Sequence, residues 1–389
     1  MKTRKIMSFI CVIGMIISVF CGSVNAYSTD NNDTDKSKVK KTIEEFFSAY
    51  ERAYDDCNKE SDICSLYFSN NRSQQTANNI SIIETMLYYR IIVKEECASD
   101  LSELNKTINY NYTSIIVEGN IAEVEVVITK LFHYPFCPDI ESGTRDNYNI
   151  TLVCESDQWK IREISNFVDD ITRTQLEDQG VNLSDIDSIS RYRNSIRDQV
   201  KAYFRETELM NETLAEEETT LRTTSYSGGG ASQYALDYAL NYNSNYADFT
   251  SYGGDCTNFV SQCMYEGGGL PMDYGSQYGT DCWFYTNSTN RSATWTGVNQ
   301  LYNYIFGSSS TINASNSTWG SVGFGDLIQL LHSDGSGYHS LIISGIVYNG
   351  SGKSDLLVCA HTTDRRHVSL ASYYPGTSRR YIDIYSSDL

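Results

Sequence analysis

The chain has 389 residues, of which 40% are hydrophobic and 12% aromatic, so it is long enough for two folded domains and too apolar for wholesale disorder. Its formal charge of −19 argues against a nucleic-acid partner and against electrostatic retention on an anionic wall or membrane. The acidity fits a soluble exported protein, although it could also serve solubility alone.

The N-terminal 26 residues have the pattern of an export signal. Lys2, Arg4 and Lys5 precede an almost wholly apolar run over 6–21, and a small residue, Ala26, stands where a signal peptidase would cleave. Cleavage there would remove three basic residues and no acidic one, so the charge would become −22. A retained membrane anchor is the alternative, because the run is nearly long enough to span a bilayer. We expect a secreted protein.

Of the 11 cysteines, two lie in this signal, which leaves nine in the mature chain. If Cys256 is a free nucleophile, the other eight could pair in an extracellular protein. Five of these eight lie in the first half and three in the second, so complete pairing would need a bridge between domains. Their scattered spacing does not resemble a zinc site, and we expect no metal or other cofactor.

Residues 36–168 predict an N-terminal α+β domain. Apolar residues at helical spacing predict a helix over 36–56, and more helix is expected near 80–100. A hairpin then turns at 118–120, and alternating residues over 148–154 and 159–164 predict further strands. This order of elements, with Trp159-Lys160-Ile161 late in the sheet, resembles the cone-shaped nuclear-transport-factor-like fold, whose members often bind small ligands or support a neighbour.

Residues 184–230 predict a helical segment that ends in a Gly/Ser linker, with Tyr226 to Gly230 as a flexible joint. From 231 to 389 the composition is uniformly rich in Tyr, Gly, Ser and Asn. Helices are expected over 234–242, over 256–264 and between 283 and 305, followed by strands at 326–331, 339–345, 356–361 and 381–385.

Cys256 opens the second of these helices, which glycines 267–269 would end. Unpaired backbone amides and the helix dipole favour a thiolate at a helix start, so Cys256 is a candidate nucleophile. Its own backbone amide would be the first oxyanion donor, with Tyr246 or Tyr252 as candidates for the second. Asp255 could bind a free amine of the substrate or cap the helix, and the sequence does not separate these roles.

Two histidines occupy matching places in the expected sheet. His339 opens one strand and His361 closes the next, so an antiparallel pair would bring both to the same end. We expect His339 to accept the thiol proton of Cys256 and His361 to orient His339, with Asp364 as the alternative orienter. We expect His332 and His367 to lie on the surface and His133 to be structural.

Several motifs of residues 231–389 resemble the putative amidase domain family of bacterial secreted proteins. They are Tyr234-Ala235, Tyr238-Ala239, Asn245-Tyr246, 255–262 (DCTNFVSQ), Gly267-Gly268, the tryptophans, 325–329 (GDLIQ), His339-Ser340 and 361–364 (HTTD). The family is similar to papain-like cell-wall hydrolases of the NlpC and CHAP types. The resemblance implies an α+β papain-like fold with Cys256, His339 and His361 as a Cys-His-polar triad. One departure is Ser232-Gln233, where the family commonly carries an arginine.

The sequence therefore predicts a secreted cysteine amidase or peptidase that forms an acyl-enzyme on Cys256. Its expected substrate is a peptidoglycan stem peptide or another extracellular amide. One alternative is a non-catalytic extracellular binding or adhesion module on the same fold. Another is a structural protein in which Cys256 forms a disulfide.

Overall fold

A computed structural model of the chain describes residues 29–389 except 60–61, 167–168, 215–224, 351, 377 and 388–389. The expected export signal over 1–26 lies outside the described residues. Among the residues described, no helix combines the length and apolar character needed to cross a bilayer.

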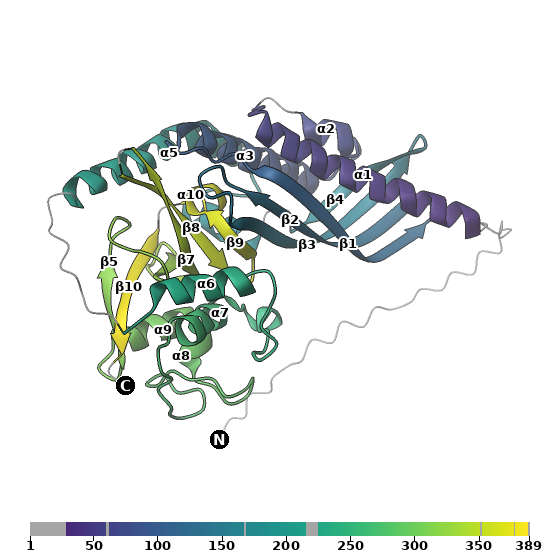
Figure 1. The fold of residues 1–389 in the computed structure, drawn as a ribbon. Helices are drawn as coiled ribbons and strands as arrows, with labels where there is room; N and C mark the ends of the chain where they lie inside the picture. The colour runs from purple at the N-terminus through teal and green to yellow at the C-terminus, as the bar shows by residue number, and fades with distance from the viewer. Residues whose placement is uncertain are drawn as a thin grey trace, which may run out of the picture.

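The fold is mixed α/β and is built on one large antiparallel sheet, with helices on both of its faces (Figure 1). Its ten strands run in the order β1-β2-β3-β9-β8-β7-β6-β10-β5, and β4 pairs with β3 beside β9. The strands are β1 (Leu104–Glu118), β2 (Ile121–His133), β3 (Glu141–Glu155), β4 (Gln158–Ser165), β5 (Ile312–Ser317), β6 (Leu327–Leu331), β7 (Gly337–Asn349), β8 (Gly352–Ala360), β9 (Asp364–Ser369) and β10 (Arg379–Ser387).

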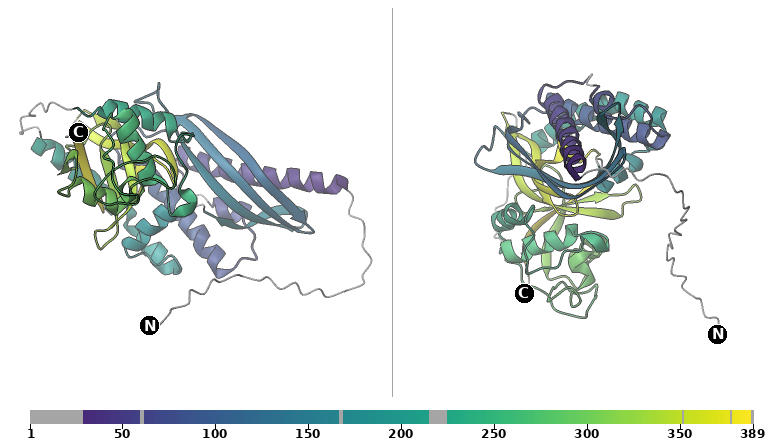
Figure 2. Two further views of the ribbon diagram at one scale, coloured as in Figure 1. Left: turned by 90° about the horizontal axis from the view of Figure 1, so that it is seen from below. Right: turned by 90° about the vertical axis from the view of Figure 1, so that its right-hand side faces the viewer.

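The N-terminal part confirms the expected helices and strands. The helices are α1 (Thr29–Asp55), α2 (Ile63–Tyr67), α3 (Gln74–Glu96), α4 (Asp170–Asp178) and α5 (Ile186–Leu214). Helix α1 lies along the curved face of β1 to β4 (Figure 2) because one stripe of its surface, which includes Val39, Ile43 and Phe46, is fully buried against that sheet.

The C-terminal part adds α6 (Gly228–Tyr238), α7 (Cys256–Gln262), α8 (Ala293–Thr296), α9 (Val298–Ile305) and α10 (Leu370–Tyr373). Helices α6, α7 and α9 pack on one face of β6, β7 and β8, through a core that includes Phe259 and Ile342. Helices α3, α5 and α10 cover the other face, through a core that includes Leu341 and Ile343. Strands β6 to β8 are therefore buried between two helical layers (Figure 1).

The two parts of the chain share this sheet, because Gly143 to Arg145 of β3 pair with Asp364 to Arg366 of β9. The stretch expected to be a flexible joint instead leads into and forms the first turn of α6. A β-carbon on Gly228 would lie 2.1 Å from the Phe324 carbonyl oxygen, and one on Gly230 would lie 2.2 Å from that of Gly267. These glycines are needed for close backbone packing rather than for flexibility.

All nine cysteines of the described residues are free thiols. The disulfide pairing considered for the eight cysteines other than Cys256 is therefore not formed, and Cys256 is not part of a disulfide.

Candidate active site

Cys256 is the first residue of α7, as the sequence predicted. Gly253 and Gly254 precede it with φ of 106° and 119°, a left-handed conformation that glycine adopts without strain, and every residue of α7 is buried. Burial raises the pKa of the Cys256 thiol, while hydrogen bonds from the Ser340 backbone and from Thr257 act in the opposite direction. In this conformation Cys256 is therefore a protonated thiol at neutral pH.

Asp255 is fully buried, and its carboxylate is already occupied. Oδ1 accepts hydrogen bonds from the Phe249 backbone N–H at 2.9 Å and from Asn258 Nδ2 at 2.8 Å, and Oδ2 lies 2.7 Å from His361 Nδ1. The side chain makes no capping bond to α7. Asp255 thus neither caps the helix nor faces a substrate amine in this structure. It forms a buried contact with His361 instead.

His361 follows β8 and is the partner of this carboxylate. Its Nε2 lies 2.9 Å from the Tyr238 carbonyl oxygen, and its ring is stacked between Tyr242 and Phe259, with centroids 3.8 and 3.9 Å away. Both ring nitrogens therefore face oxygens of the protein, the Asp255 carboxylate on one side and the Tyr238 carbonyl on the other. His361 therefore joins the ends of α6 and β8 to the start of α7, and its nitrogens are not available to orient His339.

His339 points to the other side of the sheet from Cys256. Side chains alternate along β7, and Thr257 beside the nucleophile contacts Ser340, with 3.0 Å between the two hydroxyl oxygens. His339 shares the opposite face with Leu341, and its ring centroid is 6.1 Å from that of Tyr374.

Neither ring nitrogen of His339 has a hydrogen-bond partner among the described residues. Burial and, secondarily, Arg365 lower the pKa of His339 to about 3, so the ring is neutral. The structure therefore does not bring the expected base and nucleophile together. Sequence reasoning placed His339 at the correct end of the sheet but did not establish which face it occupies.

Two of the remaining candidates, Asp364 and Tyr246, are engaged elsewhere. Asp364 accepts hydrogen bonds from Arg145 Nε at 2.9 Å and from the Tyr242 hydroxyl at 2.8 Å, so it supports the ring that stacks on His361. Of the oxyanion candidates, the Tyr246 hydroxyl donates to Glu266 at 2.7 Å and Tyr252 is 85% exposed.

The other histidines were expected to be surface or structural residues. His367 is buried, and its Nδ1 lies 3.0 Å from the Ser344 hydroxyl oxygen, so the surface expectation was wrong for it. His332 is half-buried and lies 3.0 Å from an oxygen of Asp178. His133 is half-buried on β2.

Two residues that support the site were not predicted from the sequence. Thr362 accepts a hydrogen bond from the Asp255 backbone N–H at 2.8 Å, and its φ of 78° is unusual for a β-branched residue. Asn258 donates to Asp255 and to the Ala247 carbonyl, and its Oδ1 accepts from Trp295 Nε1 at 2.8 Å. The position of Asn258, three residues after Asp255 and one turn along the same helix, was the available signal.

No group of three or more His, Cys, Asp or Glu side chains within the described part of the chain is placed to hold a metal ion.

Comparison with known proteins gives one finding. Residues 225–385 match the family described as "Putative amidase domain". No curated protein and no solved structure matches the chain. The segment from α6 to β10, which contains Cys256 and the Asp255–His361 pair, is therefore similar to an amidase domain, and this similarity suggests hydrolysis of amide bonds.

Proposed function

We propose that the chain is a secreted cysteine amidohydrolase with Cys256 as its nucleophile. The observation that carries the proposal is the place of Cys256 at the start of a wholly buried helix inside the amidase-like domain. The neighbouring Asp255 and His361 fix that helix start against β8, so they act as positioning residues for the thiol.

The reaction needs a base for the thiol proton. The Cys256 sulfur attacks the amide carbon, the carbon–nitrogen bond breaks, and the amine leaves with the proton taken from the thiol. Water then hydrolyses the thioester and restores the thiol. The backbone N–H of Cys256 lies at the helix start, where a donor to the oxyanion is required.

We assign the role of base to His339 in a second conformation of β7. A bulge at Tyr338 separates the pairs Leu331–Gly337 and Leu330–His339 in the ladder with β6. A shift of one residue in a strand turns each side chain to the opposite face, so moving this bulge past His339 would direct the imidazole towards Cys256. The two missing hydrogen bonds of His339 make its present position costly and favour such a change.

The proposed substrate is a peptidoglycan stem peptide or another extracellular amide. This rests on the export-type N-terminus of the sequence, together with the amidase-like domain.

The second candidate is a non-catalytic extracellular binding module on the same fold. It is favoured by the position of Cys256 and His339 on opposite faces of the sheet, because a protein that only binds has no need to bring them together.

Alkylation separates the two functions. The mature chain is treated with iodoacetamide near pH 7, and the rate at each cysteine is followed by mass spectrometry in the wild type, in His339→Ala and in the control His332→Ala. If the protein is a cysteine amidase, Cys256 should be alkylated faster than the other eight cysteines. Only His339→Ala should slow the alkylation of Cys256. Slow labelling of Cys256 at a rate that is the same in the wild type and in His339→Ala would favour the binding module.

A further inference from the structure

Cys137 lies on the loop between β2 and β3, beside a histidine from the other part of the chain. Its Sγ is 3.7 Å from Nε2 of His367, a hydrogen-bonding distance for sulfur, and His367 belongs to β9 of the amidase-like domain. Cys137 is half-buried and is a free thiol. A cysteine within hydrogen-bond reach of an imidazole has the arrangement of an activated nucleophile. The pair is therefore a candidate reactive site separate from Cys256.

A third side chain orients the imidazole. Nδ1 of His367 lies 3.0 Å from the hydroxyl oxygen of Ser344, which sits at a bulge in the ladder between β7 and β8. Burial raises the pKa of Cys359 to about 11, and a hydrogen bond from the Ser344 hydroxyl acts in the opposite direction. A hydroxyl that donates to Cys359 accepts from Nδ1–H of His367, which leaves the lone pair on Nε2 to face the Cys137 thiol.

The position of His367 is built into the fold at a cost in backbone conformation. Its φ is 54°, a left-handed value that few residues other than glycine adopt. Gly345 leaves room for the ring, because a β-carbon there would lie 2.6 Å from Cε1 of His367. The His367 carbonyl oxygen accepts from the Ser142 hydroxyl at 2.7 Å. Strained residues of this kind gather at functional sites, so the placement of the ring indicates more than packing.

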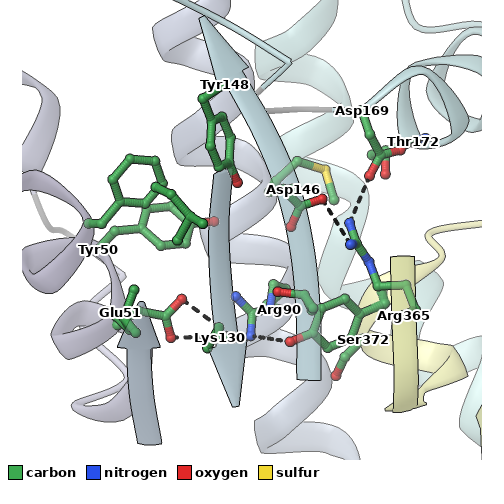
Figure 3. Close-up of a pocket in the computed structure, with 16 residues that line it drawn as sticks. Tyr50, Glu51, Arg90, Lys130, Asp146, Tyr148, Asp169, Thr172, Arg365 and Ser372 are labelled. Carbon is green, nitrogen blue, oxygen red and sulfur yellow. Dashed lines mark hydrogen bonds and ion pairs between the residues drawn. The ribbon is translucent and has the colours of Figure 1, made fainter. Parts of the chain in front are cut away.

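Ion pairs hold the strand that carries His367 beside the loop that carries the thiol. Arg365 lies 2.9 Å from Asp146 (Figure 3), and Arg366 lies 2.8 Å from Glu141. Both carboxylates belong to β3, which begins directly after the loop. The sulfur and the imidazole are therefore brought together by the pairing of the two parts of the chain.

Both members of the pair are neutral near pH 7. Burial raises the pKa of Cys137 to about 11, so the thiol keeps its proton. Burial and, secondarily, Arg366 lower the pKa of His367 to about 4, so the ring is free to accept a proton. Attack by Cys137 then requires transfer of the thiol proton to His367 in the same step, and a positioned base of this kind accelerates a reaction by about 10²–10⁴.

We propose that Cys137 is a modification site that forms a mixed disulfide with small disulfides, R–S–S–R, with His367 as the base. The Cys137 sulfur attacks one sulfur of the disulfide while its proton passes to Nε2 of His367. The S–S bond of the reagent breaks, and the departing R–S⁻ takes the proton from Nε2. The products are the mixed disulfide on Cys137 and the thiol R–SH, so Cys137 is oxidised and the leaving sulfur is reduced. This site is independent of the proposed hydrolysis at Cys256.

The test follows mixed-disulfide formation at each cysteine by mass spectrometry. The chain without residues 1–26 is treated with 2-hydroxyethyl disulfide, an uncharged reagent, at pH 6, 7 and 8. Because the proton moves within the pair, the rate at Cys137 should change less than about threefold over this range. Cys57 and Cys154 are also half-buried, and within the described residues neither is hydrogen-bonded to a histidine. They must ionise before they attack, so their rates should rise at least about tenfold.

Substitutions test the base and its orienter. His367→Asn removes the imidazole but keeps a residue that tolerates a left-handed φ, and it should slow Cys137 at least about tenfold at pH 7. Ser344→Ala should slow it at least about threefold, whereas the control His332→Asn should not. Melting temperatures show whether each variant folds, and the pH profile of the wild type needs no variant. A rate at Cys137 that rises with pH as steeply as that of Cys154, a rate unchanged in both folded variants, or no mixed disulfide at Cys137 would overturn the proposal.

Discussion

Replacing His339 with leucine should stabilise the fold, and the gain should grow as the pH falls. The His339 side chain is fully buried on the face of β7 that carries Leu341, and neither ring nitrogen has a hydrogen-bond partner in the described part of the chain. Removing them should recover about 1–3 kcal/mol, less about 1 kcal/mol for the change of shape. We therefore expect the variant to be more stable than the wild type by roughly 1 kcal/mol at pH 7.5.

The pH dependence follows from the pKa of His339, which burial and Arg365 lower to about 3. The unfolded chain binds a proton there below about pH 6.5, whereas the folded chain stays neutral until about pH 3, so the wild type loses stability relative to the variant between these values. At pH 5 this difference adds about 2 kcal/mol, from about 1.4 kcal/mol for each pH unit below 6.5.

Urea unfolding of the wild type and His339→Leu at pH 7.5 and pH 5 measures both effects. His332→Gln is the control, because His332 is half-exposed and already has a partner in Asp178. A His339→Leu variant that is less stable than the wild type, or a difference that does not change with pH, would refute the placement of His339 in the core.

Two further substitutions test the packing around Cys256. Asp255→Asn removes the carboxylate oxygen that lies 2.7 Å from His361 Nδ1, so it should lower the free energy of unfolding by about 1–3 kcal/mol in urea titrations. No loss of stability would contradict this buried contact. Gly230→Ala places a methyl group 2.2 Å from the Gly267 carbonyl oxygen and should cost about 1–3 kcal/mol in the same assay. Gly229→Ala meets nothing within 4 Å and should be near neutral, so equal effects of the two glycine variants would contradict the close approach.

The spacing of apolar residues was enough to predict most of the helices and strands, because the buried face of each one is set by residues close together in the sequence. The helix that Cys256 opens is an example, since Phe259 and Val260 pack in the core as their spacing predicted. Strand β9 was missed for the opposite reason. Its sequence, DRRHVS, is mostly polar, and its buried Arg365 is paired with Asp146 and Asp169 from the N-terminal part, more than 190 residues away.

The sequence named candidate site residues but not their arrangement. Asp255, Cys256, His339 and His361 stay predictions as site residues, whereas the antiparallel pairing of β7 and β8 is confirmed. The face occupied by His339 depends on the bulge at Tyr338, which has no signature in the apolar pattern. The partner of His361 likewise depends on how α7 packs on the end of β8, a long-range property.

Hydrolysis of purified peptidoglycan tests the central proposal most directly. The chain without residues 1–26 is incubated with the polymer, and newly released amino groups are counted. Cys256→Ala is the test variant, and Cys154→Ala, a half-buried cysteine of β3, is the control. If the protein is a cysteine amidase, the wild type and Cys154→Ala should both release amino groups. Cys256→Ala should release them at a rate at least about a thousandfold lower. Release that persists in Cys256→Ala would contradict Cys256 as the nucleophile, and no release by any of the three proteins would contradict the proposed substrate.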